Sequence, residues 1–390
     1  MKVRSRPRIV VIYNRDFEGA EADPENKARE DVKNVAQDVL RILGANGFDA
    51  SSLGITNDIP AAMSTLHQLK PCAVFNLCES IHGDNRFEAL MPLLMDLTGV
   101  SYTGSCSFGL SLALRKEKVK AVLRGHGIPV PRGGLVSSTT ECGSLGIAYP
   151  AIVKPAREDA SVGICSASVV DSEEGLERRV AYVIETYRQP ALVEEFIEGR
   201  EIYVSVLERV DGDAQVFPFF EIDFSDMPND RPNIVSFEGK WIEDSVEYKG
   251  TRPVQCEGLA PEVRATIAQT ALAAFRAIGL RDYGRIDFRL SSKDGTPYII
   301  DANPNCDLSD LGGGYSRAAK AAGLSYKDLI LQIADLALAR QVRLSSVAQL
   351  PAAAVPLDSE SLTPDESGPR SVQSQPLPSQ ARAPAPRGGV

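Results

Sequence analysis

The chain has 390 residues, of which 43% are hydrophobic and 24% are charged, a composition typical of a soluble globular protein with two or three domains. Its formal net charge of -10 argues against a general nucleic-acid binder, because phosphate binding needs a basic stripe. The seven cysteines include no Cys-x-x-Cys pair, so neither a zinc knuckle nor a disulfide framework is indicated. No apolar stretch approaches the length of a membrane span or of a signal-peptide core, and we therefore expect a cytoplasmic protein.

The first third of the chain alternates between strand and helix patterns. "RIVVIY" at 8–13 and "AVFNL" at 73–77 are short apolar runs typical of buried strands. A helical pattern from about Asn26 to Leu43 separates them, and Gly44 follows it. This alternation predicts a parallel α/β layer. One further helix is expected from Phe108 through "LALRKEKVKAVLRGHG".

The rest of the chain mixes strands and helices and ends in a low-complexity tail. "YPAIVKP", "ALVEEFI" and "EIYVSVLE" are predicted strands, and a helix is expected from Pro261 to a stop at Gly279. Two strands and a last helix near 326–340 complete this part, which makes the fold class α/β, with α+β portions. From about Ser345 the sequence is rich in Pro, Ser and Gln, which predicts a disordered tail.

The strongest chemical signal is the stretch "GRIDFRLSSKDGTPYIIDANPN", in which two strand patterns flank an Asp294-Gly295 turn. If residue numbers across this hairpin sum to 588, Asp287 faces Asp301 and Arg285 faces Asn303. Because strand side chains alternate, these four lie on one face. The opposite face is then expected to carry Ile286, Phe288, Tyr298 and Ile300.

Two carboxylates and an amide oxygen suit Mg²⁺, which prefers oxygen ligands and shares them with nucleotide phosphates. Arg285 beside them is suited to stabilising an oxyanion or a transferring phosphate. The alternative is an ordinary surface ladder of salt bridges, which polar faces of antiparallel sheets often carry. The remaining motifs of the chain favour the metal site.

The order of "LRKEKVKAVLRGHGIPVP", "YPAIVKPAREDASVGI", "LVEEFIEGRE", "FEGKW", "YGRIDFRL", "IIDANPN" and "AAGLSYKDLI" resembles the ATP-grasp ligases, and most closely their D-alanine:D-alanine ligase branch. The resemblance spans about residues 8–340. It implies a three-domain ATP-grasp architecture with an N-terminal Rossmann-like domain. The expected boundaries are 1–107 for that substrate domain, 108–205 for the central lid, 206–344 for the catalytic subdomain and 345–390 for the tail.

The resemblance also implies a nucleotide site. Lys118 and Lys154 match two lysines that contact the phosphates, and the loop after Lys154 closes over them through Ser161 and Gly163. By itself, "VEEFIEGRE" is typical of a charged hairpin, whereas in this family it binds adenine and ribose. The implied nucleotide-binding residues are Lys118, Lys154, Ser161, Gly163, Glu194, Glu195, Ile197 and Glu201.

The cofactors implied are ATP and Mg²⁺, with Mn²⁺ as an alternative metal. The matching metal ligands are Asp287, Asp301 and Asn303, although the family commonly has glutamate where this chain has Asp301. Lys240 is similar to the loop lysine that meets the terminal phosphate, and Arg285 to the arginine that stabilises the tetrahedral intermediate. Such enzymes phosphorylate a carboxylate and let an amine attack the acyl phosphate.

The resemblance breaks at the first amino-acid pocket. His82 matches a substrate-contacting histidine, but "DNRFEA" replaces the glycine- and acid-rich continuation. The family joins an N-terminal glutamate, a loop serine and a tyrosine. Here Ala160 holds the serine position and Trp241 the tyrosine position, and the glutamate position falls near Ala28, with Glu25 or Glu30 as stand-ins. We expect Trp241 to line an altered pocket.

The acceptor side of the site also differs from the family. Cys306 and Asp307 hold its proline and glycine positions. Gly312 or Gly313 falls where a serine binds the second D-alanine, and Ser309 is an alternative. Three consecutive glycines leave room for a larger acceptor, although they are also typical of a flexible turn.

These features predict an ADP-forming acid–amino-acid ligase of the peptide synthase type, acting on amino acids or small peptides other than two D-alanines. The alternatives are a D-alanine:D-alanine ligase with a rebuilt pocket, or an ATP-binding scaffold without catalysis. Retention of Arg285, Asp287, Asp301 and Asn303 argues against the scaffold. The expected partners are a small-molecule carboxylate and an amine, with no nucleic acid or membrane, and related ligases are often homodimers.

Overall fold

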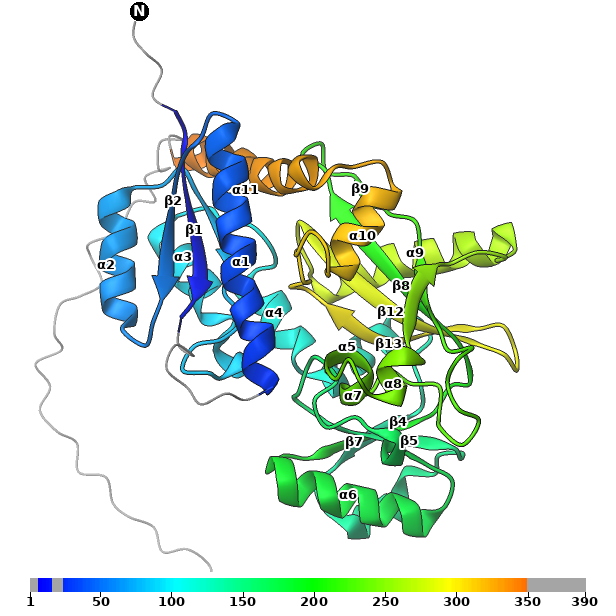
Figure 1. Ribbon diagram of the computed structural model, residues 1–390. Coiled ribbons are helices and arrows are strands. Elements are labelled where there is room, and N and C mark those ends of the chain that lie inside the picture. Colours follow the sequence, from blue (N-terminus) through cyan, green and yellow to red (C-terminus); the bar gives the residue numbers. More distant parts are fainter. Residues whose placement is uncertain (1–5, 16–23, 349–390) are drawn as a thin grey trace, which may run out of the picture. The chain divides into compact units, whose positions relative to one another are not determined.

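A computed structural model describes residues 6–15 and 24–348, with the side chains of 24–31 and 343–348 outside the description. Within these residues the chain forms three sheets with their own helices (Figure 1). The side chains of Ala28, at the expected glutamate position, and of the stand-ins Glu25 and Glu30 are therefore not described, and the predicted tail beyond Ala348 lies outside the described residues. The predicted domain boundaries stay a prediction, and the one between 205 and 206 falls inside a strand of the third sheet.

The N-terminal sheet is parallel, as its alternating pattern predicted. Its order is β2 (Asp49–Ile55), β1 (Arg8–Asn14), β3 (Ala73–Leu77). One face packs Ile9 and Val11 against the helices α1 (Pro24–Ala45) and α11 (Tyr326–Ala348). The other face packs Val10 and Ile12 against α2 (Ile59–Leu69) and α3 (Leu90–Thr98). Because both faces are covered, the central strand β1 is almost entirely apolar.

The middle sheet is antiparallel and has one helix behind it. Its order is β4 (Gly133–Val136), β7 (Ala191–Glu195), β5 (Ala151–Pro155), β6 (Val169–Val170). Val153 and Val193 pack on the helix α6 (Glu173–Tyr187). Since strand side chains alternate, Lys154 and Glu194 point from the other face.

The C-terminal sheet contains the hairpin that the sequence singled out. Its strands run in the order β11 (Arg252–Gln255), β10 (Phe220–Asp223), β8 (Gly199–Glu208), β12 (Tyr283–Ser291), β13 (Pro297–Asn303), and β9 (Ala214–Val216) pairs with β8. Ile286 and Phe288 are fully buried against Phe275 of α9 (Pro261–Ile278), the helix predicted to stop at Gly279. Gly279 takes the left-handed conformation there, at φ 75°.

The register of β12 and β13 is as predicted at its functional end and shifts beyond it. Asp287 pairs with Asp301 and Arg285 with Asn303, but Phe288 pairs with Ile299 rather than Ile300. A β-bulge inserts one extra residue at this point, so Ile299 is buried while Tyr298 and Ile300 are only partly buried. The prediction that Tyr298 and Ile300 lie on the apolar face of the hairpin is therefore wrong.

The long helix expected from Phe108 is two helices, α4 (Ser107–Ala113) and α5 (Lys116–Gly125), which break at Leu114 and Arg115. The last helix, α11, continues to Ala348, eight residues beyond the predicted end. The remaining elements are η1 (Asn85–Phe87), η2 (Thr139–Leu145), η3 (Ser166–Ser168), α7 (Phe237–Trp241), α8 (Val246–Lys249) and α10 (Gly314–Ala321).

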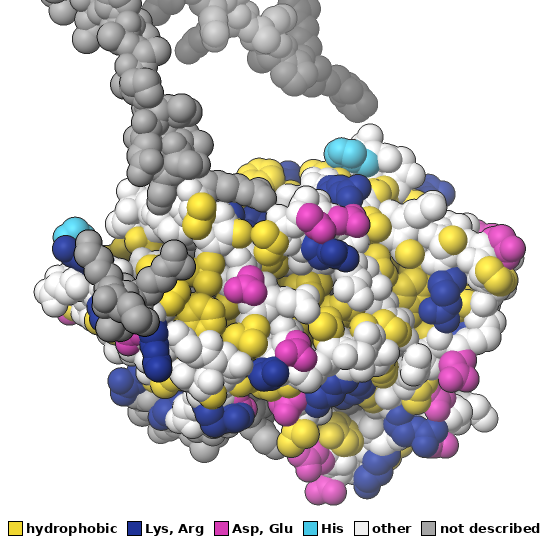
Figure 2. Space-filling view, turned by 90° about the horizontal axis from the view of Figure 1, so that it is seen from above, with side chains coloured by type: hydrophobic (Ala, Val, Ile, Leu, Met, Phe, Trp, Pro, Cys, Tyr) yellow, Lys and Arg dark blue, Asp and Glu magenta, His cyan; other side chains and the backbone are white. Residues whose placement is uncertain are grey.

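Figure 2 shows acidic and basic side chains interspersed with hydrophobic ones over one face of the protein, in keeping with the absence of a basic stripe in the sequence. A search for helices that are long and apolar enough to cross a membrane found none among the described residues.

Candidate active site

The predicted face of the C-terminal sheet forms a compact polar cluster. Arg285 on β12 donates to both oxygens of Asp287, with Nε–Oδ1 at 2.7 Å and Nη2–Oδ2 at 2.8 Å. Asn303 on β13 donates from Nδ2 to the same Oδ2 at 3.0 Å. Burial raises the pKa of Asp287, although the Arg285 guanidinium opposes that shift. Three of the four predicted side chains are thus in direct contact.

Asp301, the fourth, is held by a lysine from α5. Lys116 Nζ lies 3.2 Å and 3.1 Å from its two carboxylate oxygens, and 2.9 Å from Oδ1 of Asp159 in the loop after β5. Burial by itself raises the pKa of Asp301, but Lys116 and Lys154 outweigh this and hold it below its usual value. Lys116 is therefore a buried cation placed between Asp301 on the polar face of the C-terminal sheet and Asp159 in the loop after β5.

A second cationic cluster surrounds Glu194 on the middle sheet. Its side chain is 2% exposed, and its oxygens lie 3.1 Å from Lys120 Nζ and 3.0 Å from Lys154 Nζ. Burial lowers the pKa of Lys120 to about 8, with Glu194 opposing the shift, so the amine remains mainly protonated near pH 7. Lys154 thus lies on the site face of β5, where the sequence had predicted it.

The position of Lys118 does not agree with its expected role in the nucleotide site. Its side chain is exposed on α5, whereas Lys116 and Lys120, one helical turn apart, are buried toward the site. The helical period contained this information, because Val119 and Leu123 define the buried face of α5 and Lys116 and Lys120 lie beside it. Lys116 and Lys120 therefore replace Lys118 in the candidate site.

The remaining nucleotide positions lie along β7 and β8. Glu201 is 6% exposed, accepts from the Tyr203 hydroxyl at 2.8 Å, and pairs with Arg289 Nη2 at 3.0 Å. Glu195 and Ile197 are partly buried at the junction of the two strands, and Oε1 of Glu195 accepts from the Ala148 amide.

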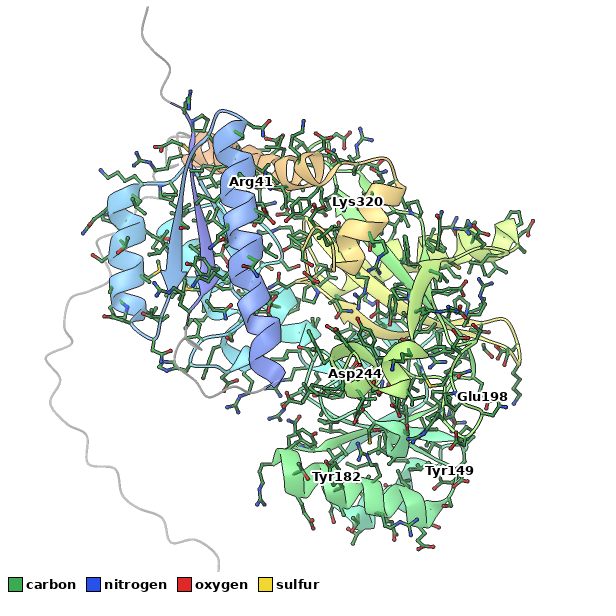
Figure 3. All side chains as sticks on the ribbon, in the orientation of Figure 1. Arg41, Tyr149, Tyr182, Glu198, Asp244 and Lys320 are labelled. Carbon is green, nitrogen blue, oxygen red and sulfur yellow. The ribbon has the colours of Figure 1, made fainter. Side chains whose placement is uncertain are left out.

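A cavity of about 510 Å³ opens beside Arg289, lined also by Phe196, Gly199 and residues of 224–233. Glu198, labelled in Figure 3, lines it where the middle sheet meets the C-terminal sheet.

The segment 156–165 after β5 is called the phosphate loop below. Gly163 is at φ 74°, and a Cβ atom there would lie 2.5 Å from Pro155, so only glycine fits. Ala160 and Ser161 are also left-handed, at φ 53° and 64°. The predicted loop residues Ser161 and Gly163 thus form a tight turn directly after Lys154.

Lys240 and Trp241 end the short helix α7. Lys240 is exposed, and its ammonium lies 5.0 Å from the centre of the Trp241 ring. Trp241 Nε1 donates to the carbonyl oxygen of Ala160 at 3.1 Å. The segment containing α7 and α8, marked by Asp244 in Figure 3, lies between the middle and C-terminal sheets. Trp241 therefore contacts the phosphate loop, a contact that the sequence did not reveal.

His82 is exposed and left-handed at φ 58°, in the turn before η1. The segment that follows contributes a residue that the sequence missed. Glu88 Oε1 accepts from Asn305 Nδ2 at 2.8 Å, and Asn305 Oδ1 accepts from the Tyr283 hydroxyl at 3.2 Å. Asn305 lies two residues beyond Asn303, so Glu88 lies near the end of β13, the strand that carries Asp301 and Asn303.

On the acceptor side, Ser309 Oγ donates to Oδ2 of Asp307 at 3.0 Å. Gly313 is buried at the start of α10, where a Cβ atom would lie 2.6 Å from the carbonyl oxygens of Asp307 and Ser309. Gly312 is exposed. Gly313 therefore allows the chain to pack closely on the 307–309 turn, and Ser309 supplies a hydroxyl in that turn.

The donor set fits a hard divalent cation in its chemistry. Asp287 and Asp301 supply carboxylate oxygens and Asn303 an amide oxygen, the ligand types that Mg²⁺ prefers, and both carboxylates are held by cationic groups. Among residues 6–15 and 24–348, no group of three or more His, Cys, Asp or Glu is placed to hold a metal. A metal here would therefore depend on Asn303 and on ligands from a nucleotide.

Comparisons with known proteins place these features in context. The family model "D-ala D-ala ligase C-terminus" matches residues 137–335. A D-alanine–D-alanine ligase of Xylella fastidiosa is 30% identical over 311 residues, which is 77% of this chain and 92% of the relative. An uncharacterised protein of Sinorhizobium fredii is 34% identical over 264 residues, or 68% and 74% of the two chains.

Among solved structures, a D-alanine–D-alanine ligase of Bacillus anthracis in complex with ATP aligns with a TM-score of 0.64. The alignment covers 86% of this chain and 99% of that one, at 19% identity. The likeness shows a shared three-domain ATP-grasp fold, and the expected fold class is confirmed.

Proposed function

Because the chain belongs to the D-alanine–D-alanine ligase family, and is an ATP-dependent ligase of that type, we propose that it joins a carboxylate to an amine through an acyl phosphate. The proposal rests mainly on one structural observation. Asp287, Asp301, Asn303 and Arg285 share one face of the C-terminal sheet, and Lys116 links that face to the phosphate loop.

The proposed reaction has two steps. A substrate carboxylate oxygen attacks the γ-phosphorus of ATP, which releases ADP and forms the acyl phosphate. An amine nitrogen then attacks the acyl carbon, loses its proton, and expels phosphate as the amide bond forms. Negative charge develops on oxygen in both steps, so positioned cations lower the barrier.

The chain's own residues have distinct tasks in this scheme. Lys116, Lys120 and Lys154 offset the charge of the polyphosphate, and Lys240 is placed to meet its terminal group. Arg285 is held by Asp287 in a fixed orientation, from which its remaining N–H groups can stabilise the oxyanion. Asp287, Asp301 and Asn303 would hold Mg²⁺, which supplies charge neutralisation between the phosphates.

We further propose that the substrates are not two D-alanines. Ala160 and Trp241 remove the serine and tyrosine hydroxyls of the first pocket, and glycine occupies the expected serine position of the second. A larger or differently charged amino acid or peptide is the expected acceptor. The second candidate, a D-alanine:D-alanine ligase with a rebuilt pocket, is favoured by the 30% identity to the Xylella enzyme over 92% of its length.

ADP release tests the proposed function. Purified protein with ATP and Mg²⁺ is screened against pairs of amino acids and dipeptides, and we expect ADP release that requires both a carboxylate and an amine. Asp301→Asn is expected to reduce turnover by roughly a hundredfold or more while the melting temperature changes little. Unchanged turnover in Asp301→Asn would rule out its proposed metal role, and nucleotide binding without ADP release across the panel would favour a non-catalytic scaffold.

A further inference from the structure

The two ends of the phosphate loop are anchored within the middle-sheet region. Gln189 accepts from the Arg157 amide at 2.7 Å and donates to Glu158 at 2.7 Å. At the other end, Arg179 on α6 donates to the Gly163 carbonyl at 2.7 Å. These contacts fix where the loop leaves and rejoins its own sheet, but they do not reach its tip.

The tip of the loop, residues 159–161, is held from outside that region. Ala160 and Ser161 both have left-handed backbone conformations, which are unfavourable for residues other than glycine and persist only when surrounding contacts maintain them. Lys116 holds the Asp159 side chain, and Trp241 holds the Ala160 carbonyl. A further main-chain bond joins the start of α7 to the loop, from the Phe237 amide to the Ile164 carbonyl at 2.8 Å.

We propose that Trp241 is a positioning residue, whose indole N–H fastens the tip of the phosphate loop to α7 and thereby keeps the loop closed over Lys154. Its partner is a main-chain oxygen, so the contact needs no side chain at position 160. The ring also lies against the Lys240 ammonium. One side chain thus contacts both the loop and Lys240.

The contact gives Trp241 a role other than substrate binding. An open loop admits water to the acyl phosphate, which is hydrolysed instead of being captured by the amine. This consequence rests on the proposed function, whereas the contact of the loop with α7 does not. The experiment therefore needs one readout that requires no turnover and one that does.

Trp241 is the single tryptophan of the chain, so biosynthetic replacement of tryptophan by an analogue changes one side chain only. Benzothienylalanine keeps the shape of the ring but replaces its N–H with sulfur and cannot donate. Fluorotryptophan keeps the N–H and serves as the matched control. Both are prepared in the full-length protein, together with Trp241→Phe, and their melting temperatures are compared with that of the wild type.

The first readout is the rate of elastase cleavage after Ala160, at the tip of the loop, measured without added ligand by mass spectrometry. Cleavage of a loop follows the population of its open form. Loss of one hydrogen bond is expected to accelerate cleavage about three- to tenfold in the benzothienylalanine protein and in Trp241→Phe, and to leave the fluorotryptophan protein unchanged. Equal cleavage rates in all four proteins would overturn the proposal.

The second readout is the ratio of ADP released to amide product formed, with a substrate pair that supports turnover. We expect the ratio to rise when the N–H is lost and to stay at the wild-type value with fluorotryptophan. A purely structural role would lower the rate without changing this ratio, and an unchanged ratio would contradict a role in closure during turnover. If cleavage changes while no substrate pair releases ADP, the positioning role stands and the proposed function fails.

Discussion

Asp159 places a negative charge in the loop that we propose to lie against the polyphosphate of ATP. Its carboxylate pairs with Lys116, whose side chain is 8% exposed, whereas that of Asp159 is 47% exposed. A bound phosphate would compete with Asp159 for the same ammonium group. Under the proposed function, Asp159 would therefore oppose nucleotide binding.

We predict that Asp159→Asn tightens ATP binding by about two- to fivefold, because it removes a partly exposed charge that competes for Lys116. Isothermal titration calorimetry with ATP and Mg²⁺ measures the change. Glu174→Gln is the matched control, since it removes an acidic charge from the exposed surface of α6. Weaker binding by Asp159→Asn alone would show that the acid assists the nucleotide.

Glu88 is a second acidic residue, and its surroundings shift its pKa far enough to make folding stability depend on pH. Burial raises its pKa from 4.5 to about 8; the hydrogen bond from Asn305 opposes the shift, and Asp159 and Glu79 add to it. Between these two values the folded protein retains a proton that the unfolded chain has lost. Folding stability therefore falls as the pH rises from about 4.5 to 8.

Glu88→Gln removes this titration and keeps an oxygen that can accept from Asn305. We predict that its melting temperature exceeds that of the wild type, and that the difference grows between pH 5 and pH 8. Differential scanning calorimetry across this range measures it. A difference that is independent of pH would mean that Glu88 ionises normally in the folded protein.

At the scale of the element, α5 presents two lysines to the site and one to solvent. Lys116 and Lys120 are 7% and 4% exposed, while Lys118 lies on the exposed side of the same helix. A residue two positions along an α-helix is rotated by about 200°, so neighbouring lysines in "KEKVK" cannot share a function.

We predict that Lys116→Met weakens ATP binding roughly tenfold or more, because it removes a charged hydrogen-bond donor from the phosphates, while Lys118→Met has no effect. Binding is measured by calorimetry, after circular dichroism has shown that both variants are folded. A larger loss in Lys118→Met would restore the original assignment from the sequence.

The sequence was sufficient for the functional end of the hairpin and insufficient for the rest of it. The pairing of Asp287 with Asp301 could be predicted because side chains alternate along a strand. The bulge after Asp287 could not, because Ile299 and Ile300 are equally apolar and either can occupy the buried position. The polar strand β2 was missed for a related reason, since "DASSLGI" lacks the apolar run of its neighbours.

Contacts between segments that are far apart along the chain also could not be predicted from the sequence. The Trp241–Ala160 and Glu88–Asn305 bonds join residues 81 and 217 positions apart, and no local pattern encodes such contacts. The resemblance located the motifs in order, but it placed the first lysine two residues away from the buried one. Physical periodicity along α5 corrects that assignment.

At the scale of the whole molecule, α11 connects the last part of the described chain to the first sheet. Figure 1 shows α11 beside the N-terminal sheet and α1, and its Leu329 and Ile333 belong to the same core as Ile9 and Val11. Arg340 Nη2 donates to the fully buried Asp282 at 2.8 Å and also to the Tyr102 carbonyl. Asp282 in turn accepts from the Gly104 amide, so one buried carboxylate joins three parts of the chain. Separately, Asn305 beyond the end of β13 donates to the Cys78 carbonyl and to Glu88, which joins the C-terminal sheet to the N-terminal part of the chain.

The proposed site thus includes residues from all three parts of the chain. We propose that its ATP-dependent chemistry is retained while its amino-acid pockets are changed. The most direct test is the identity of the product. Purified protein is incubated with ATP, Mg²⁺ and an equimolar mixture of D-alanine, other amino acids and dipeptides, and the amide products are identified by mass spectrometry. We predict a product other than D-alanyl-D-alanine, absent in Asp301→Asn; D-alanyl-D-alanine as the main product at ordinary ligase rates would contradict the account.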